Sequence, residues 1–378
     1  MKKLSLYLFV NVDWFFFSHR LDVAREAADN NYDVNVFAEL TNQHSFHSNY
    51  NFTLISSPIL RRKVNLLYLL WEIWKVYRLL VKEKPAIVHA VTAKPIIICG
   101  IAARLANIPF IGSVTGLGPL FHGAGVSGHL RRKLARSIYS FVFARDKSRV
   151  IVQTQHDLSF LLSVVKGLEN RFHITNGSGV RLSKYSTAPI GKPLKIVMAS
   201  RLLVAKGVFD YLKAAEIVNK KFDSSEIELY LAGAPDIESG DSIPLEIIKN
   251  CCLKSGVTYL GFQDDMPSFL AAADVFVYPS IYPEGLPKVL IEAAASSCAV
   301  ITTDHPGCRD AIVENSTGLL VPPNTPEEIA RKILLLARDH DRLERMKKSA
   351  RSFAEEMYSI DSVLNTHMLC YRLSCQNL

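Results

Sequence analysis

Short apolar runs alternate along the chain with longer stretches that repeat apolar residues at helical spacing. The runs at 4–10, 110–114, 196–199 and 275–278 are typical of strands buried on both faces, because helices cover both sides of a parallel sheet. No repeat of short fixed period is present. The pattern predicts an α/β protein, and 378 residues suffice for two domains that each bury a core.

A cluster of turn-forming residues at 186–193 marks the expected domain boundary. We expect an N-terminal domain over 1–185 and a second domain over 193–362. The charge distribution agrees with this division: residues 1–185 hold 24 Lys and Arg against 11 Asp and Glu, and residues 186–378 hold 20 against 25. The basic character of the chain therefore belongs to its N-terminal half.

The apolar run 4–10 follows two lysines and mimics the start of a secretory signal. Asn11 and Asp13 interrupt the run, and no small-residue cleavage site follows, so a buried first strand is the better interpretation. No stretch approaches the roughly 20 apolar residues of a membrane-spanning helix. Seven scattered cysteines without a C-x-x-C pair indicate reduced thiols and a cytoplasmic protein.

Glu284 and Glu292 lie on a predicted strand–turn–helix unit. The strand 275–278 ends at Pro279, Pro287 suits the first helical position, and residues 289–295 are predicted helical. The N-terminus of such a helix, at the carboxyl end of a strand, is a natural seat for a diphosphate. The two carboxylates would then bind hydroxyl groups of a sugar and a ribose. The alternative is an ordinary strand–turn–helix unit that carries two glutamates by chance.

Arg201 and Lys206 flank a second predicted loop, between the strand 196–199 and a helix that begins near Val208. Gly207 permits a tight approach before this helix. Two fixed cations beside a helix N-terminus suit a diphosphate leaving group, whose developing charge they neutralise. A solvated loop with incidental basic residues is the alternative.

These segments together resemble the donor-site signature of family 4 glycosyltransferases. The resemblance rests on Arg201 with Lys206-Gly207, Glu284-Gly-Leu-Pro287 with Glu292, and the segments Asp304–Asp310 and Thr317–Pro323. In the N-terminal half, 17–21 and 114–118 look like the branch that builds bacterial surface polysaccharides. Relatives in this branch transfer N-acetylhexosamine to sugars carried on undecaprenyl diphosphate. The resemblance implies a GT-B fold, two doubly wound Rossmann-like domains facing across a cleft, with retaining, metal-independent chemistry.

The resemblance also implies residue roles at the donor site. Arg201 and Lys206 would hold the diphosphate, Glu292 the ribose hydroxyls and Glu284 the donor sugar. The donor would further contact Phe262 at the nucleobase and Gly285, Leu286 and Pro287 at the sugar and phosphate. Pro287 has no N–H to donate where the family often has glycine, which puts one backbone contact in doubt. A helix over about 363–378 would pack back on the N-terminal domain.

Candidate residues on the acceptor side come from the N-terminal half. His19 and Arg20 follow the first predicted strand, and His19 is the candidate for a catalytic role there, although a lone histidine is more often structural. The remaining candidates are Thr115, Gly116, Gly118 and His122, with His89 ranked lower. The alternative for Gly116 and Gly118 is that they only allow a tight turn. Asn11-Val-Asp-Trp14 replaces the Gly-Gly pair of many family members, so an N-terminal phosphate contact is in doubt.

Two basic helices are predicted within the N-terminal half, at 61–78 and 129–141. The first places Leu66, Leu70, Ile73 and Tyr77 on one stripe, with two tryptophans near its edge. Such helices lie on an anionic membrane leaflet, or their apolar stripes simply cover the sheet. We expect peripheral binding to the cytoplasmic face of the inner membrane. No nucleic-acid-binding module accompanies the basic charge.

We therefore expect a glycosyltransferase that uses a nucleotide sugar as substrate and needs no cofactor. UDP is the preferred nucleotide, and GDP stays open. The sequence has no H-x-x-x-H pair of histidines, so we expect no metal site. The rival functions are a nucleotide-sugar 2-epimerase of the same architecture and a non-catalytic nucleotide-sugar-binding protein at the membrane.

Overall fold

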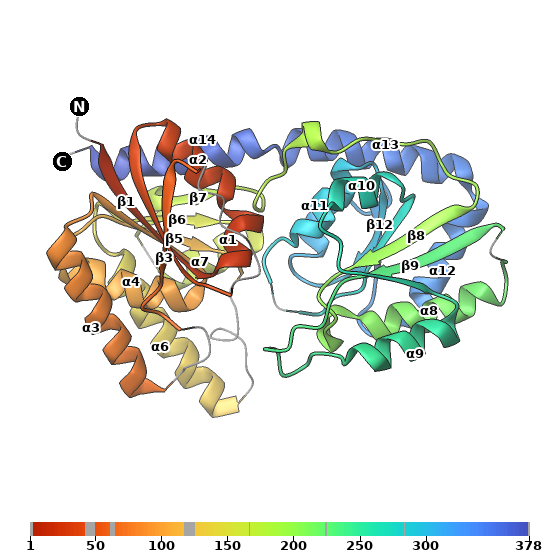
Figure 1. Cartoon of the computed structure of the whole chain (residues 1–378), viewed down its shortest axis with the longest axis horizontal. Helices are drawn as coiled ribbons and strands as arrows, with labels where there is room; N and C mark the ends of the chain where they lie inside the picture. The colour runs from red at the N-terminus through yellow and green to blue at the C-terminus, as the bar shows by residue number, and fades with distance from the viewer. Residues whose placement is uncertain are drawn as a thin grey trace. The chain divides into compact units, whose positions relative to one another are not determined.

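The computed structural model describes residues 3–41, 50–60, 65–116, 125–165, 167–223, 225–282 and 284–376, without the side chains of 125–132 and 164. The chain forms two compact units (Figure 1). The first comprises Met1–Ser178 with Asp361–Leu378, and the second comprises Gly179–Ile360.

The described part of the first unit is built on a seven-stranded parallel sheet with strand order β3-β2-β1-β4-β5-β6-β7. Its strands are β1 (Leu4–Val12), β2 (Tyr32–Glu39), β3 (Phe52–Ser56), β4 (Ile87–Val91), β5 (Phe110–Val114), β6 (Arg149–Val152) and β7 (Phe172–Ile174). Its helices are α1 (Asp13–His19), α2 (Leu21–Asp29), α3 (Leu66–Glu83), α4 (Ala93–Leu105), α6 (Gly125–Phe143), α7 (Gln155–Val164) and α14 (Ile360–Cys375).

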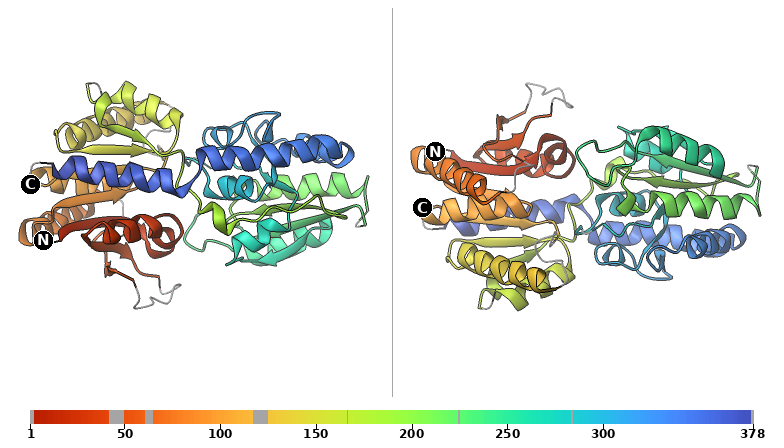
Figure 2. Two further views of the ribbon diagram at one scale, coloured as in Figure 1. Left: turned by 90° about the horizontal axis from the view of Figure 1, so that it is seen from above. Right: turned by 90° about the horizontal axis from the view of Figure 1, so that it is seen from below.

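Strand β4 shows how both faces of this sheet are covered. Val88 and Ala90 pack into a core that also contains residues of α3, α4 and α6. Between them, His89 points to the opposite face because side chains alternate along a strand. There it contacts Tyr371 of α14, the blue helix that crosses this unit in Figure 2. Helices on both faces explain why the strand is apolar on either side of the histidine.

The described part of the second unit contains a six-stranded parallel sheet, in the order β10-β9-β8-β11-β12-β13. Its strands are β8 (Leu194–Ala199), β9 (Ile227–Ala232), β10 (Thr258–Gly261), β11 (Val275–Tyr278), β12 (Ala299–Thr303) and β13 (Gly318–Val321). Its helices are α8 (Val208–Asn219), α9 (Leu245–Ser255), α10 (Met266–Ala271), α11 (Lys288–Ala295), α12 (Pro326–Arg338) and α13 (His340–Met357).

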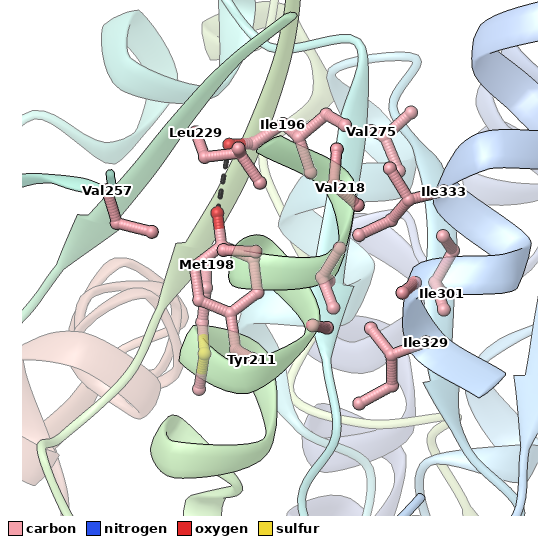
Figure 3. Packing of buried hydrophobic residues seen from close by; sticks show 14 of the residues in the cluster. Ile196, Met198, Tyr211, Val218, Leu229, Val257, Val275, Ile301, Ile329 and Ile333 are labelled. Atoms are coloured by element: carbon pink, nitrogen blue, oxygen red, sulfur yellow. Dashed lines mark hydrogen bonds between the residues drawn. The ribbon is translucent and has the colours of Figure 1, made fainter. Parts of the chain in front are cut away.

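The core of the second unit lies between its sheet and the helices α8, α9 and α12 (Figure 3). Tyr211 of α8 is fully buried in it, and its hydroxyl donates to the carbonyl oxygen of Ile196 at 3.1 Å. This bond satisfies the one polar atom of an otherwise apolar ring and fixes α8 on β8.

The chain passes into the second unit at 178–179, upstream of the turn-rich segment at 186–193, and returns to the first unit at 360–361. Residues 179–185 belong to the second unit, because Val180 pairs with Ser359 and Tyr185 packs into that unit's core. The segment 186–193 is a loop that leads into β8. The amino-acid composition predicted the loop at 186–193. Backbone pairing and burial decide that residues 179–185 belong to the second unit.

Both sheets reverse their strand order beside the first strand of the unit, between β1 and β4 and between β8 and β11. At such a reversal the loops that leave the two central strands diverge, and the carboxyl ends of these strands form a crevice suited to ligands. In the second unit the two diverging loops are the ones that carry Arg201, Lys206 and Glu284.

Asp274, just before β11, ties three segments of the second unit together. Its carboxylate accepts from the backbone N–H groups of Gly191 and Lys195 and from Lys347 Nζ of α13, at 2.7 Å for the lysine. Both side chains of the ion pair are nearly inaccessible, at 5% for Lys347 and 3% for Asp274. The pair therefore anchors α13 and the loop before β8 to the sheet.

Substitution Lys347→Met should destabilise the second unit by about 3–5 kcal/mol, because it leaves a buried carboxylate without its cation. The neighbouring Lys348→Met removes only a surface ion pair and should cost less than about 1 kcal/mol. Urea unfolding of the two variants measures the difference. Equal losses of unfolding free energy would contradict the anchoring role of Asp274.

Candidate functional site

The strand–turn–helix unit around Glu284 is present in the second unit. β11 ends at Tyr278 and α11 begins at Lys288. Pro287 is the N-cap, one position before the helix, and not its first residue as expected. Its extended backbone, with φ −61° and ψ 121°, turns the loop into the helix. The loop that carries Glu284 therefore ends at the N-terminus of α11.

The loop after β8 packs directly on the loop after β11. Ile281 donates its N–H to the carbonyl oxygen of Ala205 at 2.9 Å. Gly207 has a φ of 75°, and a Cβ atom at this position would lie 2.2 Å from the carbonyl oxygen of Pro279. Only glycine allows this approach, which holds Lys206 beside the second loop.

Lys206, Tyr278 and Glu284 form a compact polar cluster where the two loops meet. Lys206 Nζ lies 2.5 Å from Glu284 Oε1 and donates to the Tyr278 hydroxyl at 2.7 Å. The same hydroxyl donates to Glu284 Oε1 at 2.8 Å. Burial and the nearby carboxylate raise the pKa of Tyr278 well above its ordinary value, so the phenol keeps its proton. Lys206 is 4% exposed, whereas Glu284 is 26% exposed and is open to a ligand.

Arg201 lies close to this cluster through Tyr282. The Tyr282 ring is 5.4 Å from the Arg201 guanidinium and 4.7 Å from Lys206 Nζ, so both cations face one aromatic ring. Arg201 also forms a 2.8 Å ion pair with Asp236. The predicted diphosphate-binding cations are thus brought together, and each has a carboxylate partner.

Glu292 is 9% exposed and is held by two partners on one oxygen. Its Oε1 atom accepts from the Tyr185 hydroxyl and from Lys288 Nζ, both at 3.0 Å. Burial, and next the Glu292 carboxylate, raise the pKa of Tyr185. The phenol is therefore a proton donor at neutral pH, and it fixes the orientation of the carboxylate.

Gly307 packs closely against the backbone of Glu284 and Gly285. This glycine has a φ of 84°, and a Cβ atom there would lie 2.1 Å from the carbonyl oxygen of Gly285 and 2.9 Å from that of Glu284. Leu286 is buried in the core of the unit. Phe262 follows β10 and is 66% exposed, so its ring is accessible for stacking.

Four residues that position this cluster were not among the predicted site residues: Tyr185, Tyr278, Tyr282 and Gly307. Tyr278 offered a signal, because a tyrosine that ends a buried strand next to an expected site places its hydroxyl there. Gly307 lies inside a segment that carried the family resemblance, but its role depends on a loop more than twenty residues away.

The N-terminal candidates lie in the first unit and have different environments. His19 is the last residue of α1, and its ring stacks on Phe15 with centroids 4.4 Å apart. Arg20 is 2% exposed and links α1 to α2, with Nη1 donating to the carbonyl oxygen of His19. Burial lowers the pKa of Arg20 to about 10, which leaves it cationic at neutral pH.

His89, the lower-ranked candidate, lies within β4 and not in a loop after that strand. Its Nδ1 pairs with the Tyr371 hydroxyl at 2.8 Å and its Nε2 with Ser113 Oγ at 2.7 Å. Both ring nitrogens are engaged in the core, which indicates a structural role. Thr115 and Gly116 follow β5, and Gly116 has a φ of 124°. Gly118 and His122 lie outside the described residues.

Among the described residues, no group of three or more His, Cys, Asp or Glu side chains is placed to hold a metal ion. The described helices include none with both the length and the apolar character needed to cross a bilayer. Cys308 lies near Glu284, but its thiol is buried, and burial raises its pKa to about 12. It is therefore not a nucleophile at neutral pH.

Two family models match the chain. The model described as Glycosyl transferase 4-like matches residues 5–154, and the model described as Glycosyl transferases group 1 matches residues 183–353. The second match contains every predicted donor-site residue.

Two bacterial relatives have names that give a diphosphoundecaprenol-linked acceptor. The chain is 29% identical over 257 residues to the N,N'-diacetylbacillosaminyl-diphospho-undecaprenol alpha-1,3-N-acetylgalactosaminyltransferase of Campylobacter jejuni. The aligned region covers 63% of this chain and 64% of that relative. It is 24% identical over 308 residues to the UDP-Gal:alpha-D-GlcNAc-diphosphoundecaprenol alpha-1,3-galactosyltransferase of Escherichia coli, with 78% and 77% covered.

Solved structures show the same fold. A glycosyltransferase from Rickettsia africae superposes with a TM-score of 0.77 at 18% identity over 100% of both chains. Anabaena HepE in complex with UDP superposes with a TM-score of 0.73 at 17% identity over 97% of this chain and 98% of that one. Together, the two family models, these structural neighbours and the two parallel α/β sheets show that the chain belongs to the group 1, family 4-like glycosyltransferases of the GT-B fold.

Proposed function

We propose that this protein is a retaining glycosyltransferase that moves a hexose or N-acetylhexosamine from a UDP-sugar to a sugar acceptor on undecaprenyl diphosphate. Its place would be the synthesis of O-antigen, capsule or exopolysaccharide. The observation that carries the proposal is the cluster at the β8–β11 reversal, where Arg201, Lys206, Glu284 and the N-terminus of α11 converge. The names of the Campylobacter and Escherichia relatives support the acceptor class.

The diphosphate of the donor would bind between Arg201, Lys206 and the N-terminus of α11. As it leaves the anomeric carbon, its growing negative charge is stabilised by the two cations and by the N–H groups of the helix. Because both cations already have carboxylate partners, the diphosphate must draw them partly away from Asp236 and Glu284. The Tyr278 phenol bridges Lys206 and Glu284 and keeps the carboxylate in place during this exchange.

Glu284 would bind hydroxyl groups of the donor sugar through Oε2, because Oε1 accepts from Lys206 and Tyr278. Glu292 would bind the ribose hydroxyls in the same way, with Oε1 held by Tyr185 and Lys288. Phe262 would stack on the base, and Gly285, Leu286 and Pro287 would line the sugar and phosphates. Retention follows from attack of the acceptor hydroxyl on the face that the diphosphate leaves, with its proton passing to the departing phosphate.

The first unit would supply the acceptor side. His19, Arg20, Thr115 and Gly116 are the candidates that the structure describes, together with Gly118 and His122. The excess of Lys and Arg in residues 1–185 suits an acceptor that carries a lipid diphosphate. The protein would act at the cytoplasmic face of the inner membrane, bound peripherally through this unit, and it would need neither a metal nor a cofactor.

Nucleotide release from a panel of UDP- and GDP-sugars, with and without lipid-diphosphate-linked acceptors, tests the proposed function. We expect release that depends on acceptor and a product one sugar larger. Interconversion of the donor without acceptor would instead identify an epimerase. Donor binding without turnover under any acceptor would identify a binding protein.

Substitution Glu284→Gln should lower kcat/KM about 10²–10³-fold, because a neutral amide neither pairs with Lys206 nor accepts sugar hydroxyls as strongly. Steady-state kinetics measures the loss, and an unchanged circular dichroism spectrum at the assay temperature shows that the fold is kept. Glu246→Gln on the exposed surface of α9 is the matched control. Full activity in the Glu284 variant would remove this residue from the mechanism.

Substitution Tyr185→Phe should raise the donor KM about two- to tenfold, since it deletes one hydrogen bond to Glu292. The effect should vanish for a donor that lacks the ribose hydroxyls, because Glu292 then has nothing to bind. Tyr211→Phe removes another buried phenol of the same unit away from the site and controls for general destabilisation. The same increase in KM for both donors would exclude a link between Tyr185 and ribose.

A further inference from the structure

Helix α3 carries two separate apolar faces. Its inner face packs into the core of the first unit through Leu69, Ile73, Val76 and Leu80. The stripe expected from the sequence was different, because it included Leu66 and Leu70, which are 71% and 54% exposed. A helix that only covers a sheet needs the inner face alone.

The outer face of α3 is apolar along its N-terminal half. Leu67 is 80% exposed, Leu70 54%, Trp71 40% and Trp74 53%. These positions recur at the three- and four-residue spacing that places side chains on one side of a helix. Single exposed apolar residues are ordinary on a protein surface, but four large ones in two turns form a contiguous patch.

The same face is basic along its C-terminal half. Lys75 Nζ lies 3.7 Å from the centre of the Trp71 ring, and the Arg78 guanidinium lies 5.5 Å from that of Trp74. Lys82 follows one turn later and is 82% exposed. Each of the first two cations therefore sits on a tryptophan that separates it from the leucines.

The carboxylate of Glu72 does not offset the charge of Lys75 and Arg78. Glu72 is fully buried on another side of the helix, where it pairs with Lys94 at 3.0 Å and accepts from the N–H of Leu60. In the part of α3 that follows, Glu83 pairs with Lys82. Trp71, Trp74, Lys75 and Arg78 thus form a surface on which cations and aromatic rings dominate.

We infer that the outer face of α3 inserts into the boundary between headgroups and acyl chains of an anionic phospholipid leaflet. The inference rests on the proposed function, since a lipid-linked acceptor lies in such a leaflet. Leu67 and Leu70 enter the acyl region, the two indoles occupy the headgroup level, and Lys75, Arg78 and Lys82 reach lipid phosphates. The order of these residues along α3 sets the N-terminal half of the helix deeper than the C-terminal half.

Charge selects a membrane over a second copy of this chain. In a two-fold dimer the same patch would meet itself, and Lys75 and Arg78 would find no carboxylate among Leu67, Leu70, Trp71 and Trp74 of the other copy. An anionic leaflet provides the opposite charge and an apolar layer together. Each cation near such a surface strengthens binding.

The structure also selects α3 over the other predicted membrane helix, α6. Among the side chains of α6 that the structure describes, Leu134 is 60% and Phe141 is 42% exposed. They are seven residues apart, and the Arg104 guanidinium covers the Phe141 ring at 4.4 Å. This is a scattered pair, without the contiguous indole and leucine surface of α3.

Co-sedimentation with vesicles of phosphatidylglycerol and phosphatidylethanolamine tests the inference. The unmodified protein should bind, and Leu67→Gln combined with Trp74→Gln should weaken binding at least about tenfold. The matched control is Leu253→Gln on α9, where an 84% exposed leucine stands in the second unit. Unchanged binding of the double variant, or no binding of the unmodified protein, would overturn the inference.

Tryptophan fluorescence gives a second, independent readout. Two of the three tryptophans of the chain lie on this face, and the third is Trp14. With brominated lipids, the Trp14→Phe variant should be quenched, whereas Trp71→Phe combined with Trp74→Phe, which retains Trp14 alone, should not. Quenching of Trp14 alone would place a different surface in the membrane and overturn the inference.

Transfer to a short-chain, water-soluble acceptor separates this inference from the proposed function. The Leu67/Trp74 double variant should keep full activity on that acceptor and lose activity on an acceptor embedded in vesicles. If the double variant loses vesicle binding and the unmodified protein shows no transferase activity on either acceptor, the proposed function is rejected and the membrane-binding role of α3 is kept. A dimer in sedimentation equilibrium that the double variant abolishes would assign the face to self-association and overturn the inference.

Discussion

The close approach of two loops at the β8–β11 reversal is the constraint on which the proposed donor site depends. Gly207 has no Cβ to collide with Pro279, so the backbone after β8 lies against the backbone after β11. This contact places Lys206 beside the loop after β11, where it donates to the Tyr278 hydroxyl and pairs with Glu284. A side chain at position 207 would separate the cation from its carboxylate and disrupt the site without touching a charged group.

Charge balance explains how the site can hold several buried ionic groups. An unpaired ammonium or carboxylate at these positions would be strongly destabilising, and each has an internal partner. Lys206 pairs with Glu284, Arg201 with Asp236, and Glu292 with Lys288. The tyrosines add proton donors without adding charge. A diphosphate bound as proposed would replace these partners, so its binding free energy would be a difference between two sets of ionic contacts.

The chain uses aromatic and basic residues together in two different ways. In the second unit, Tyr282 faces Arg201 and Lys206 inside a polar cluster that is mostly buried. On α3, Lys75 and Arg78 lie over the rings of Trp71 and Trp74 on an exposed surface. Burial decides the consequence: the enclosed cations suit a small anion, whereas the open ones suit an extended anionic surface.

The sequence by itself determined the α/β class, the central strands, the loops that carry Arg201, Lys206 and Glu284, and the basic character of the N-terminal half. These features follow from local apolar runs, glycine and proline positions, and composition, which do not require knowledge of distant contacts. Only the tertiary structure decided that Tyr185 joins the second unit, that Gly307 supports Gly285, that His89 is a core residue and that Leu66 and Leu70 face outward. The first three depend on a partner far away in the chain. For Leu66 and Leu70 the reason is different: helical spacing defines a stripe of apolar residues but does not say which of two apolar faces meets the core.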